Sequence, residues 1–214
     1  MLSTPGVRRR AVLGAVAGLA AAPFLANPAF AAAPKIYLDP GHGGTDGGAA
    51  ANGLVEKNIT LDIALRTRTI LLNNWSVSVR MSRTTDITRS LTYRTDDANA
   101  WGANLFVSIH INSGGGTGFE SYVYPGVGSR TLNLQDDVHA AVLNNVRDIG
   151  SVTDRGQKQA NFHVLRETAM SAVLTENMFI DTSHDAALLA RDDFRQAAAR
   201  GHARGIARFL GLIA

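Results

Sequence analysis

Hydrophobic and polar positions follow two different periods along residues 34–214. Short apolar runs or two-residue alternation predict strands at 35–39, 77–81, 105–110, 119–124, 162–166 and 172–176. Helical spacing of apolar residues predicts helices at 57–72, 90–100, 132–146 and 192–210, with Ser90 and Asp192 as N-caps. Because strands and helices alternate, we predict a single α/β domain with a mostly parallel twisted sheet flanked by helices.

The first 31 residues have another pattern, and we predict that they form a secretory signal peptide. Three arginines at 8–10 precede an apolar, Ala/Gly-rich run at 11–25, and Ala-Phe-Ala at 29–31 offers a cleavage site. The apolar run is shorter than the roughly 20 residues of a membrane span. The paired arginines indicate the twin-arginine route, with a Sec signal or an uncleaved anchor as alternatives. We therefore expect export to the periplasm, cell wall or medium, with no stable membrane insertion after signal removal.

The charge balance changes when the predicted signal is set aside. The whole chain has 21 basic and 18 acidic residues, but three of the arginines and none of the acids lie in 1–31. The remaining chain, 34–214, is therefore balanced, and it gives no indication of nucleic-acid binding. The chain has no cysteine, which excludes disulfides, a thiol nucleophile and a thiolate metal ligand.

Polar residues that can bind a metal or move a proton follow the predicted strands. His42 comes just after the strand 35–39, His110 ends the strand 105–110, and Glu176 ends the strand 172–176. The carboxyl ends of parallel strands meet at one edge of a sheet, so these side chains can converge although they are distant in sequence. Glu56 precedes the helix 57–72, and the start of that helix can face the same crevice.

Two histidines and one carboxylate are a ligand set that suits a catalytic zinc ion, which keeps a fourth position for water. A further carboxylate should then take the proton of the water, and Glu176 is available for that role. Each residue also has an ordinary alternative, such as a hydrogen-bonded histidine at a strand end or a glutamate at a helix start. Glu176 follows Ala-Val-Leu-Thr, so its burial would be costly without a partner.

Several segments match, in order, the pattern of one enzyme family. Residues 36–49, Ile-Tyr-Leu-Asp-Pro-Gly-His-Gly-Gly-Thr-Asp-Gly-Gly-Ala, and the segment Glu-Lys-Asn at 56–58 contain the first two candidate ligands. The later matches are at 82–86, 94–100, 106–112, 164–166 and 172–176. Together they extend over nearly all of the chain after the predicted signal. The combination resembles the zinc-dependent N-acetylmuramoyl-L-alanine amidases of bacterial division and sporulation.

The resemblance implies that His42, Glu56 and His110 bind one Zn²⁺ per chain and that Glu176 is the catalytic acid and base. It implies peptidoglycan as the substrate, cut at the amide between N-acetylmuramic acid and L-alanine, and a mixed sheet flanked by helices. It leaves open an activator protein as a second partner, and we expect a monomer. The alternatives are an inactive wall-binding module or another peptidoglycan metal hydrolase, such as an endopeptidase or a deacetylase.

The chain departs from the family pattern beside the proposed catalytic residue. Thr175 stands where the family commonly has a hydrophobic residue, and residues 177–180, Asn-Met-Phe-Ile, replace a turn of the Gly-Phe type. Some members insert a long autoinhibitory helix between the third ligand and the catalytic glutamate. Here that interval holds one ordinary helix, at 129–147, so our hypothesis is that the enzyme is not self-blocked.

Other residues could support the site or could be structural. Asn112 could orient His110 or bind substrate, and Asp46 could hold a zinc ligand from behind. Three arginines could bind stem-peptide carboxylates or form ion pairs with Asp86, Asp96 or Glu167: Arg83, Arg94 and Arg166. We expect core packing for His163, with a position facing the cleft as the alternative, and sheet packing in preference to substrate stacking for Tyr122 and Tyr124. We expect surface positions for His139, His184 and His202.

Overall fold

The computed structural model describes residues 1–2 and 32–213, and residues 33–213 form the unit described below. The predicted signal peptide, 1–31, therefore lies outside the described residues apart from Met1 and Leu2. Within the described part of the chain, no helix has the length and apolar character needed to cross a membrane.

A six-stranded sheet is the centre of this unit. Its strands are β1 (Lys35–Pro40), β4 (Ser78–Met81), β5 (Leu105–Asn112), β6 (Phe119–Val123), β7 (Asp154–Gln159) and β8 (Ser171–Phe179), and a separate short hairpin joins β2 (Ala50–Ala51) to β3 (Leu54–Val55). The strand order is β4-β1-β5-β8-β6-β7. The first four strands in this order pair in parallel, while β6 pairs antiparallel with β8 and parallel with β7. The prediction of a mostly parallel sheet is confirmed.

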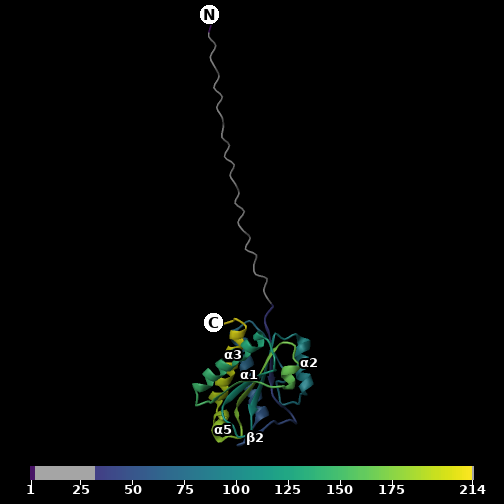
Figure 1. Cartoon of the computed structure of the whole chain (residues 1–214), viewed down its shortest axis with the longest axis vertical. Helices are drawn as coiled ribbons and strands as arrows, with labels where there is room; N and C mark the ends of the chain where they lie inside the picture. Colours follow the sequence, from purple (N-terminus) through teal and green to yellow (C-terminus); the bar gives the residue numbers. More distant parts are fainter. Residues whose placement is uncertain (3–31, 214) are drawn as a thin grey trace. The chain divides into compact units, whose positions relative to one another are not determined.

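Helices cover both faces of the sheet. They are α1 (Glu56–Asn74), α2 (Leu91–Trp101), α3 (Ser129–Arg147), α4 (His163–Arg166), α5 (Ser183–Ala190) and α6 (Asp192–Phe209). The larger hydrophobic cluster includes α1, α3 and α6, whereas α2 and α4 contribute to a second cluster on the opposite face. Figure 1 shows α2 and α3 on opposite sides of the strands.

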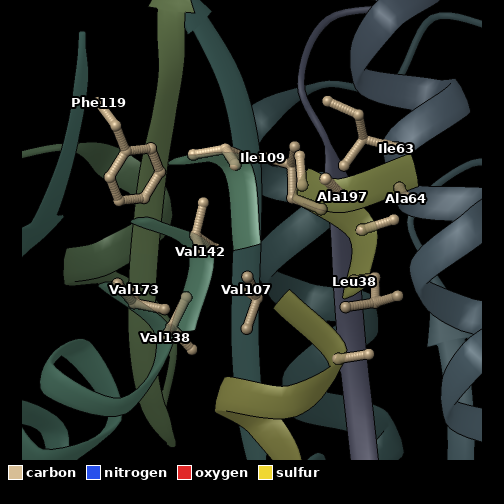
Figure 2. Packing of buried hydrophobic residues seen from close by; sticks show 14 of the residues in the cluster. Leu38, Ile63, Ala64, Val107, Ile109, Phe119, Val138, Val142, Val173 and Ala197 are labelled. Atoms are coloured by element: carbon tan, nitrogen blue, oxygen red, sulfur yellow. The ribbon is translucent and has the colours of Figure 1, made fainter. Parts of the chain in front are cut away.

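Two-residue alternation decides which strand side chains face each cluster. Leu38, Val107 and Ile109 pack with Ile63 of α1 in the larger cluster (Figure 2). Each such aliphatic side chain stabilises the fold by about 1.5–3 kcal/mol when it is fully buried. The intervening residues, such as Tyr37, face the α2 side, and the same alternation puts His110 of β5 and Glu176 of β8 on that side.

One strand prediction is wrong. Residues 162–166 form no strand: His163–Arg166 is the short helix α4, whose first turn closes with bonds from the Leu165 and Arg166 amides to the Phe162 carbonyl. A short apolar run of this kind does not distinguish helix from strand by periodicity. Besides β8, β6 pairs with β7, which was not predicted. The sequence of β7, Asp-Arg-Gly-Gln-Lys-Gln, has no apolar residue from which a strand could be predicted.

The two predicted helix caps have different outcomes. Ser90 caps α2 as predicted, since its hydroxyl accepts a hydrogen bond from the Tyr93 amide at 3.0 Å. Asp192 is the first residue of α6 and not its cap, because Arg191 holds the N-cap position without a side-chain cap bond. The Asp192 carboxylate instead pairs with Arg66 of α1, and so it joins two helices.

Two of the three histidines predicted at the surface are core residues. His184 is exposed as predicted, but His139 of α3 and His202 of α6 are buried. His202 Nδ1 lies 2.8 Å from the Ala198 carbonyl and must donate to it, because a carbonyl only accepts. In the neutral ring, Nε2 is then free to accept from the Thr175 hydroxyl, 2.9 Å away.

We predict that His202 makes the fold sensitive to acid. Burial lowers the pKa of His202 to about 4 from the 6.5 of a free imidazole. Below pH 6.5 the unfolded chain binds more protons at His202 than the folded chain does. The contribution of His202 to the free energy of unfolding is therefore complete above pH 6.5 and is lost as the pH falls to about 4. Its size is about 3 kcal/mol. Denaturant unfolding between pH 4 and 7 should show that loss, and His202→Gln should remove it; parallel pH curves for the two proteins would contradict this role.

Candidate metal centre

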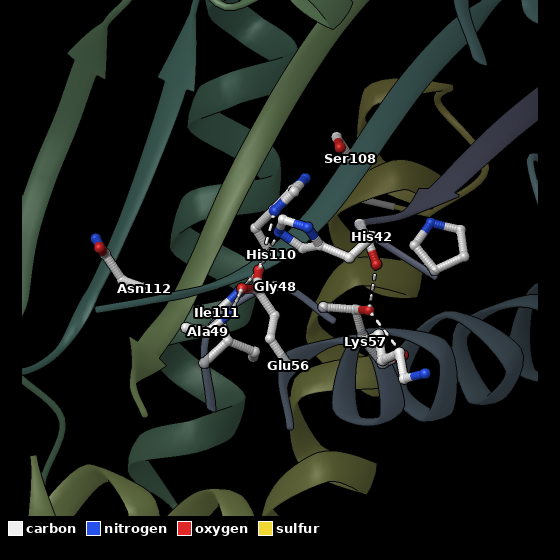
Figure 3. A network of polar contacts seen from close by, with 12 residues as sticks. His42, Gly48, Ala49, Glu56, Lys57, Ser108, His110, Ile111 and Asn112 are labelled. Carbon is white, nitrogen blue, oxygen red and sulfur yellow. Dashed lines mark hydrogen bonds and ion pairs between the residues drawn. The ribbon is translucent and has the colours of Figure 1, made fainter. Parts of the chain in front are cut away.

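Three side chains from separate elements meet at the carboxyl edge of the sheet. His42 follows β1, Glu56 begins α1, and His110 lies near the end of β5 (Figure 3). One candidate ligand atom from each residue lies within 4.8 Å of the other two. The structure thus brings together the histidines and the carboxylate that the sequence places at strand ends and at a helix start.

The Glu56 carboxylate is the centre of this group. Its Oε1 lies 3.0 Å from His110 Nδ1 and 3.2 Å from His42 Nε2, and it accepts a bond from the Ile111 amide. Its Oε2 accepts a bond from the Ala49 amide at 2.9 Å. Burial alone would raise the pKa of Glu56, but the bonds from the two imidazoles outweigh it and hold this pKa well below its usual range. Glu56 is therefore a fixed, ionised carboxylate that could hold a metal ion.

The two histidines show that this cluster attracts positive charge. The hydrogen bond to Glu56 raises the pKa of His42 to about 9. Burial opposes protonation of His110, yet the bond to Glu56 and the nearby Glu176 still raise its pKa. Metal ions and protons compete for such groups, so a divalent cation can bind in place of the protons. The donor set and its geometry both fit a metal ion.

Asp46 fixes the orientation of the His42 ring. Both oxygens of Asp46 lie 2.9 Å from His42 Nδ1, which directs Nε2 toward Glu56. A carboxylate behind a ligating histidine sets the ring tautomer and makes the ligating nitrogen more basic. The position of Asp46 agrees with the supporting role predicted from the sequence.

Two glycines allow the ligand groups to come this close. A Cβ atom on Gly41 would lie 2.4 Å from Cε1 of His110, so any larger residue would displace that ring. Gly48 has a φ of +65°, and a Cβ atom there would lie 2.5 Å from Oε2 of Glu56. Both positions therefore require glycine, one for space and the other for space and backbone conformation.

Glu176 lies beside the cluster on the neighbouring strand. It is the β8 partner of His110 in the parallel register, and both side chains line the same pocket. Burial raises the pKa of Glu176 to about 7, against the opposing effect of His110. Its Oε2 is buried and has no hydrogen-bond partner among the described residues. A carboxyl group that titrates near neutral pH and keeps one oxygen free is suited to proton transfer.

A pocket of about 510 Å³ opens onto these groups. His42, His110 and Glu176 lie along it, and it is bordered by Leu91 of α2 and Phe162 beside α4, which are 55% and 38% exposed. The remaining lining residues are Asp39, Asp46, Thr88, Arg89, Ser90, Arg94, His163, Val164 and Leu174. His163, which we predicted to pack in the core, thus faces this pocket from α4. The site combines a polar centre with apolar edges that can contact a large substrate.

A buried ion pair supports the loop that carries His42. Arg94 Nη1 lies 2.5 Å from Asp39 Oδ1, and both side chains are almost fully buried. Burial would raise the pKa of Asp39, but Arg94 and the Ser82 hydroxyl hold it below its usual value. Arg94 also donates to the His42 carbonyl at 2.8 Å. The partner of Arg94 is therefore Asp39, which was not among the candidates considered from the sequence.

The other two candidate arginines are also engaged within the protein. Arg83 is buried and donates to the carbonyls of Gly41 and Lys57, so it shapes the loop before Glu56. Arg166 pairs with Glu167, which is the structural alternative predicted for it, and it does not line the pocket.

Asn112 points away from the metal cluster (Figure 3). Its amide nitrogen donates to Glu120 of β6 at 2.7 Å and its amide oxygen accepts from the Ser113 amide, so these hydrogen bonds do not involve the His110 ring. Glu120 also binds Arg155 and Lys158 of β7. The sequence analysis did not single out these residues, because β7 lacks the apolar pattern of a strand and its place beside β6 was not predicted.

Comparison with known proteins identifies the family. Residues 36–208 match the family model described as N-acetylmuramoyl-L-alanine amidase. The chain belongs to this family. It is 57% identical over 179 residues to the amidase CwlM of Bacillus licheniformis, covering 83% of this chain and 69% of that protein. It is 56% identical, with the same coverages, to the sporulation-specific N-acetylmuramoyl-L-alanine amidase of Bacillus subtilis strain 168.

Solved amidase structures have the same fold. The catalytic domain of the amidase CwlV from Bacillus (Paenibacillus) polymyxa var. colistinus is 34% identical, with a TM-score of 0.78, over 84% of this chain and 99% of that one. The amidase of Clostridium difficile 630 is 30% identical, with a TM-score of 0.80, over 86% and 100% of the two chains. Sequence and structure therefore place the chain among the amidases.

Proposed function

We propose that the protein is a zinc-dependent amidase in which Glu176 transfers the proton. Membership of the N-acetylmuramoyl-L-alanine amidase family makes it a hydrolase of the amide between N-acetylmuramic acid and L-alanine in peptidoglycan. The observation that carries the zinc assignment is the convergence of His42, Glu56 and His110 beside a buried carboxyl group with a free oxygen.

In this proposal, the ligand atoms are His42 Nε2, Glu56 Oε1 and His110 Nδ1. Three ligands of these kinds, with a fourth position open to water, are the usual set of a catalytic zinc. When bound, zinc would supply positive charge that polarises a carbonyl oxygen and lowers the pKa of water. Asp46 would hold the His42 ring in the ligating tautomer, and the Ala49 and Ile111 amides would hold the Glu56 carboxylate.

Glu176 would act first as base and then as acid. With a pKa near 7, its carboxylate can accept the proton of the attacking water and return it to the departing alanine amine. The site surroundings keep the carboxyl out of bulk solvent, and this is what raises its pKa. The pocket beside it would hold the substrate so that the amide carbonyl lies between Glu176 and the two histidines.

We further propose that residues 1–31 direct export and that 34–214 is the catalytic domain, because the substrate lies outside the cytoplasmic membrane. The helix at 129–147 is α3, which packs against α6 and contributes no residue to the pocket. That position supports a site that is not blocked by its own helix. Full activity of the isolated monomer would favour this view over a requirement for an activator protein.

Metal removal tests the proposal. Purified peptidoglycan should yield free stem peptides with an N-terminal alanine when the protein is loaded with zinc, and none after chelation, with recovery when zinc is restored. Mass spectrometry of the products distinguishes the alternatives. Cuts within the peptide would indicate an endopeptidase, loss of acetyl groups would indicate a deacetylase, and binding without any product would indicate a wall-binding module.

A further inference from the structure

A second polar cluster lies on the same face of the sheet as the metal centre. Its centre is Glu120 of β6, which is almost fully buried. The carboxylate accepts hydrogen bonds from Asn112 and Tyr122 at 2.7 Å, from Arg155 Nε at 2.7 Å, and from Lys158 Nζ. Two cations from the edge strand β7 therefore meet one carboxylate.

This cluster has more positive charge than the Glu120 carboxylate neutralises, and it has N–H donors that Glu120 does not use. Burial would raise the pKa of Glu120, but the bonds from Lys158, Tyr122 and Arg155 keep it below its usual value, so the carboxylate is ionised. One negative charge then faces two positive ones. Each cation gives a single bond to Glu120, whereas an ammonium has three N–H donors and a guanidinium five. About a third of each cationic side chain is exposed, so the remaining donors can reach solvent.

The order of the strands places the cluster on one defined side of the reacting bond. His110 of β5, Glu176 of β8 and Glu120 of β6 are register partners on three adjacent strands. The metal ligand, the proton donor and the cationic cluster thus follow one another across the sheet. In the proposed mechanism Glu176 protonates the departing alanine amine, and a stem peptide that continues from Glu176 away from His110 runs toward β6 and β7.

The distances suit a short peptide. Adjacent strands lie about 4.8 Å apart, and Lys158 reaches back over β6 to Glu120, so its ammonium lies about one to two strand spacings from Glu176. Two extended residues span about 7 Å. The Tyr122 ring contacts the ring of Phe162, which borders the pocket, with centroids 5.2 Å apart. Tyr122, which also donates to Glu120, therefore joins the border of the pocket to the cluster.

We propose that Lys158 and Arg155 form a subsite for a carboxylate on the stem-peptide residue that follows alanine. This inference rests on the proposed amidase function and assigns the side of the site that binds the leaving peptide. The cluster is prepared for a second carboxylate because Glu120 fixes both cations while using only part of their donors. It would make the enzyme prefer stem peptides in which that carboxylate is free.

The test uses two N-acetylmuramoyl-L-alanyl peptides that differ only in whether the carboxylate of the residue after alanine is free or amidated. The zinc-loaded enzyme should cleave both, with kcat/KM about tenfold higher for the free carboxylate. Lys158→Gln should lower kcat/KM for the free form by about tenfold and leave the amidated form within about twofold. Lys158→Arg should keep most of the preference, since it keeps the charge.

Controls separate this subsite from a structural role. Arg191→Gln removes an exposed cation that pairs with Asp193 and should leave the preference intact. Unfolding midpoints and zinc content show whether Lys158→Gln is folded and loaded. An equal loss on both substrates, or no preference in the parent enzyme, would overturn the subsite while the amidase function stands. Failure of the zinc-loaded parent to cleave either substrate would overturn the amidase function itself.

Discussion

Glu176→Gln should lower turnover by about a thousandfold and leave the metal in place. The amide has the size of the carboxyl but cannot accept the proton of water, and general acid–base catalysis contributes about 10²–10⁴-fold. Glu176 is not among the three convergent ligands, so metal binding should be unchanged. The measurements are kcat on a defined muramoyl peptide and zinc per chain. Glu167→Gln, at an exposed glutamate that pairs with Arg166, is the matched control.

The same variant should fold at least as well as the parent. The free Oε2 of Glu176 has no hydrogen bond to lose, and a neutral amide costs less to bury than an ionised carboxyl. Loss of turnover together with a normal unfolding midpoint would therefore locate the defect in chemistry. Turnover close to that of the parent would show that Glu176 does not transfer the proton, and loss of zinc would mean that Glu176 acts as a ligand.

Arg94→Met should destabilise the protein by about 3–5 kcal/mol, because it leaves the Asp39 carboxylate buried without its ionic partner. It should also weaken zinc binding, since the Arg94 bond to the His42 carbonyl is lost. Denaturant unfolding gives the first effect and metal competition gives the second. Arg80→Gln, which breaks the exposed pair with Asp97, should cost less than about 1 kcal/mol.

A double variant separates the two roles of Arg94. Asp39→Leu in the Arg94→Met background removes the unpaired charge and should recover much of the stability. It should not recover zinc affinity, because the bond to the His42 carbonyl is still missing. If both properties return together, the ion pair acts on the site only through overall stability, and the bond to His42 has no separate effect.

The residues at strand ends could be located from the sequence because their positions follow from chain direction and pattern. His110 and Glu176 follow dense apolar runs, and parallel strands bring such positions to one edge, although β5 and β8 continue beyond them to Asn112 and Phe179. The ring orientation of His42 could be anticipated from the nearby Asp46. Departures from the family pattern become understandable only in three dimensions: the polar Thr175 is matched by His202, whose buried ring lies on a distant helix.

The remaining features depend on which strands become neighbours. β7 has no apolar residue, so neither its existence nor its pairing with β6 could be predicted. The Glu120 cluster could not be predicted either, because Arg155 and Lys158 lie on β7. The Asp39–Arg94 pair joins a strand to a helix 55 positions later, and local charge spacing suggested other partners. Burial of His139 and His202 depends on helix packing, since both polar rings find partners in the core.

The metal centre is divided between parts of the fold that should open at different rates. His110 and Glu176 lie on β5 and β8, which have hydrogen-bonded neighbours on both sides, whereas His42 lies in a glycine-rich loop and Glu56 in the first turn of a helix. Amide hydrogens of inner strands exchange with solvent mainly on global unfolding, while loops and helix ends open locally. An ion could therefore leave as the loop opens, with the inner strands intact, and the fold would be ready to bind another.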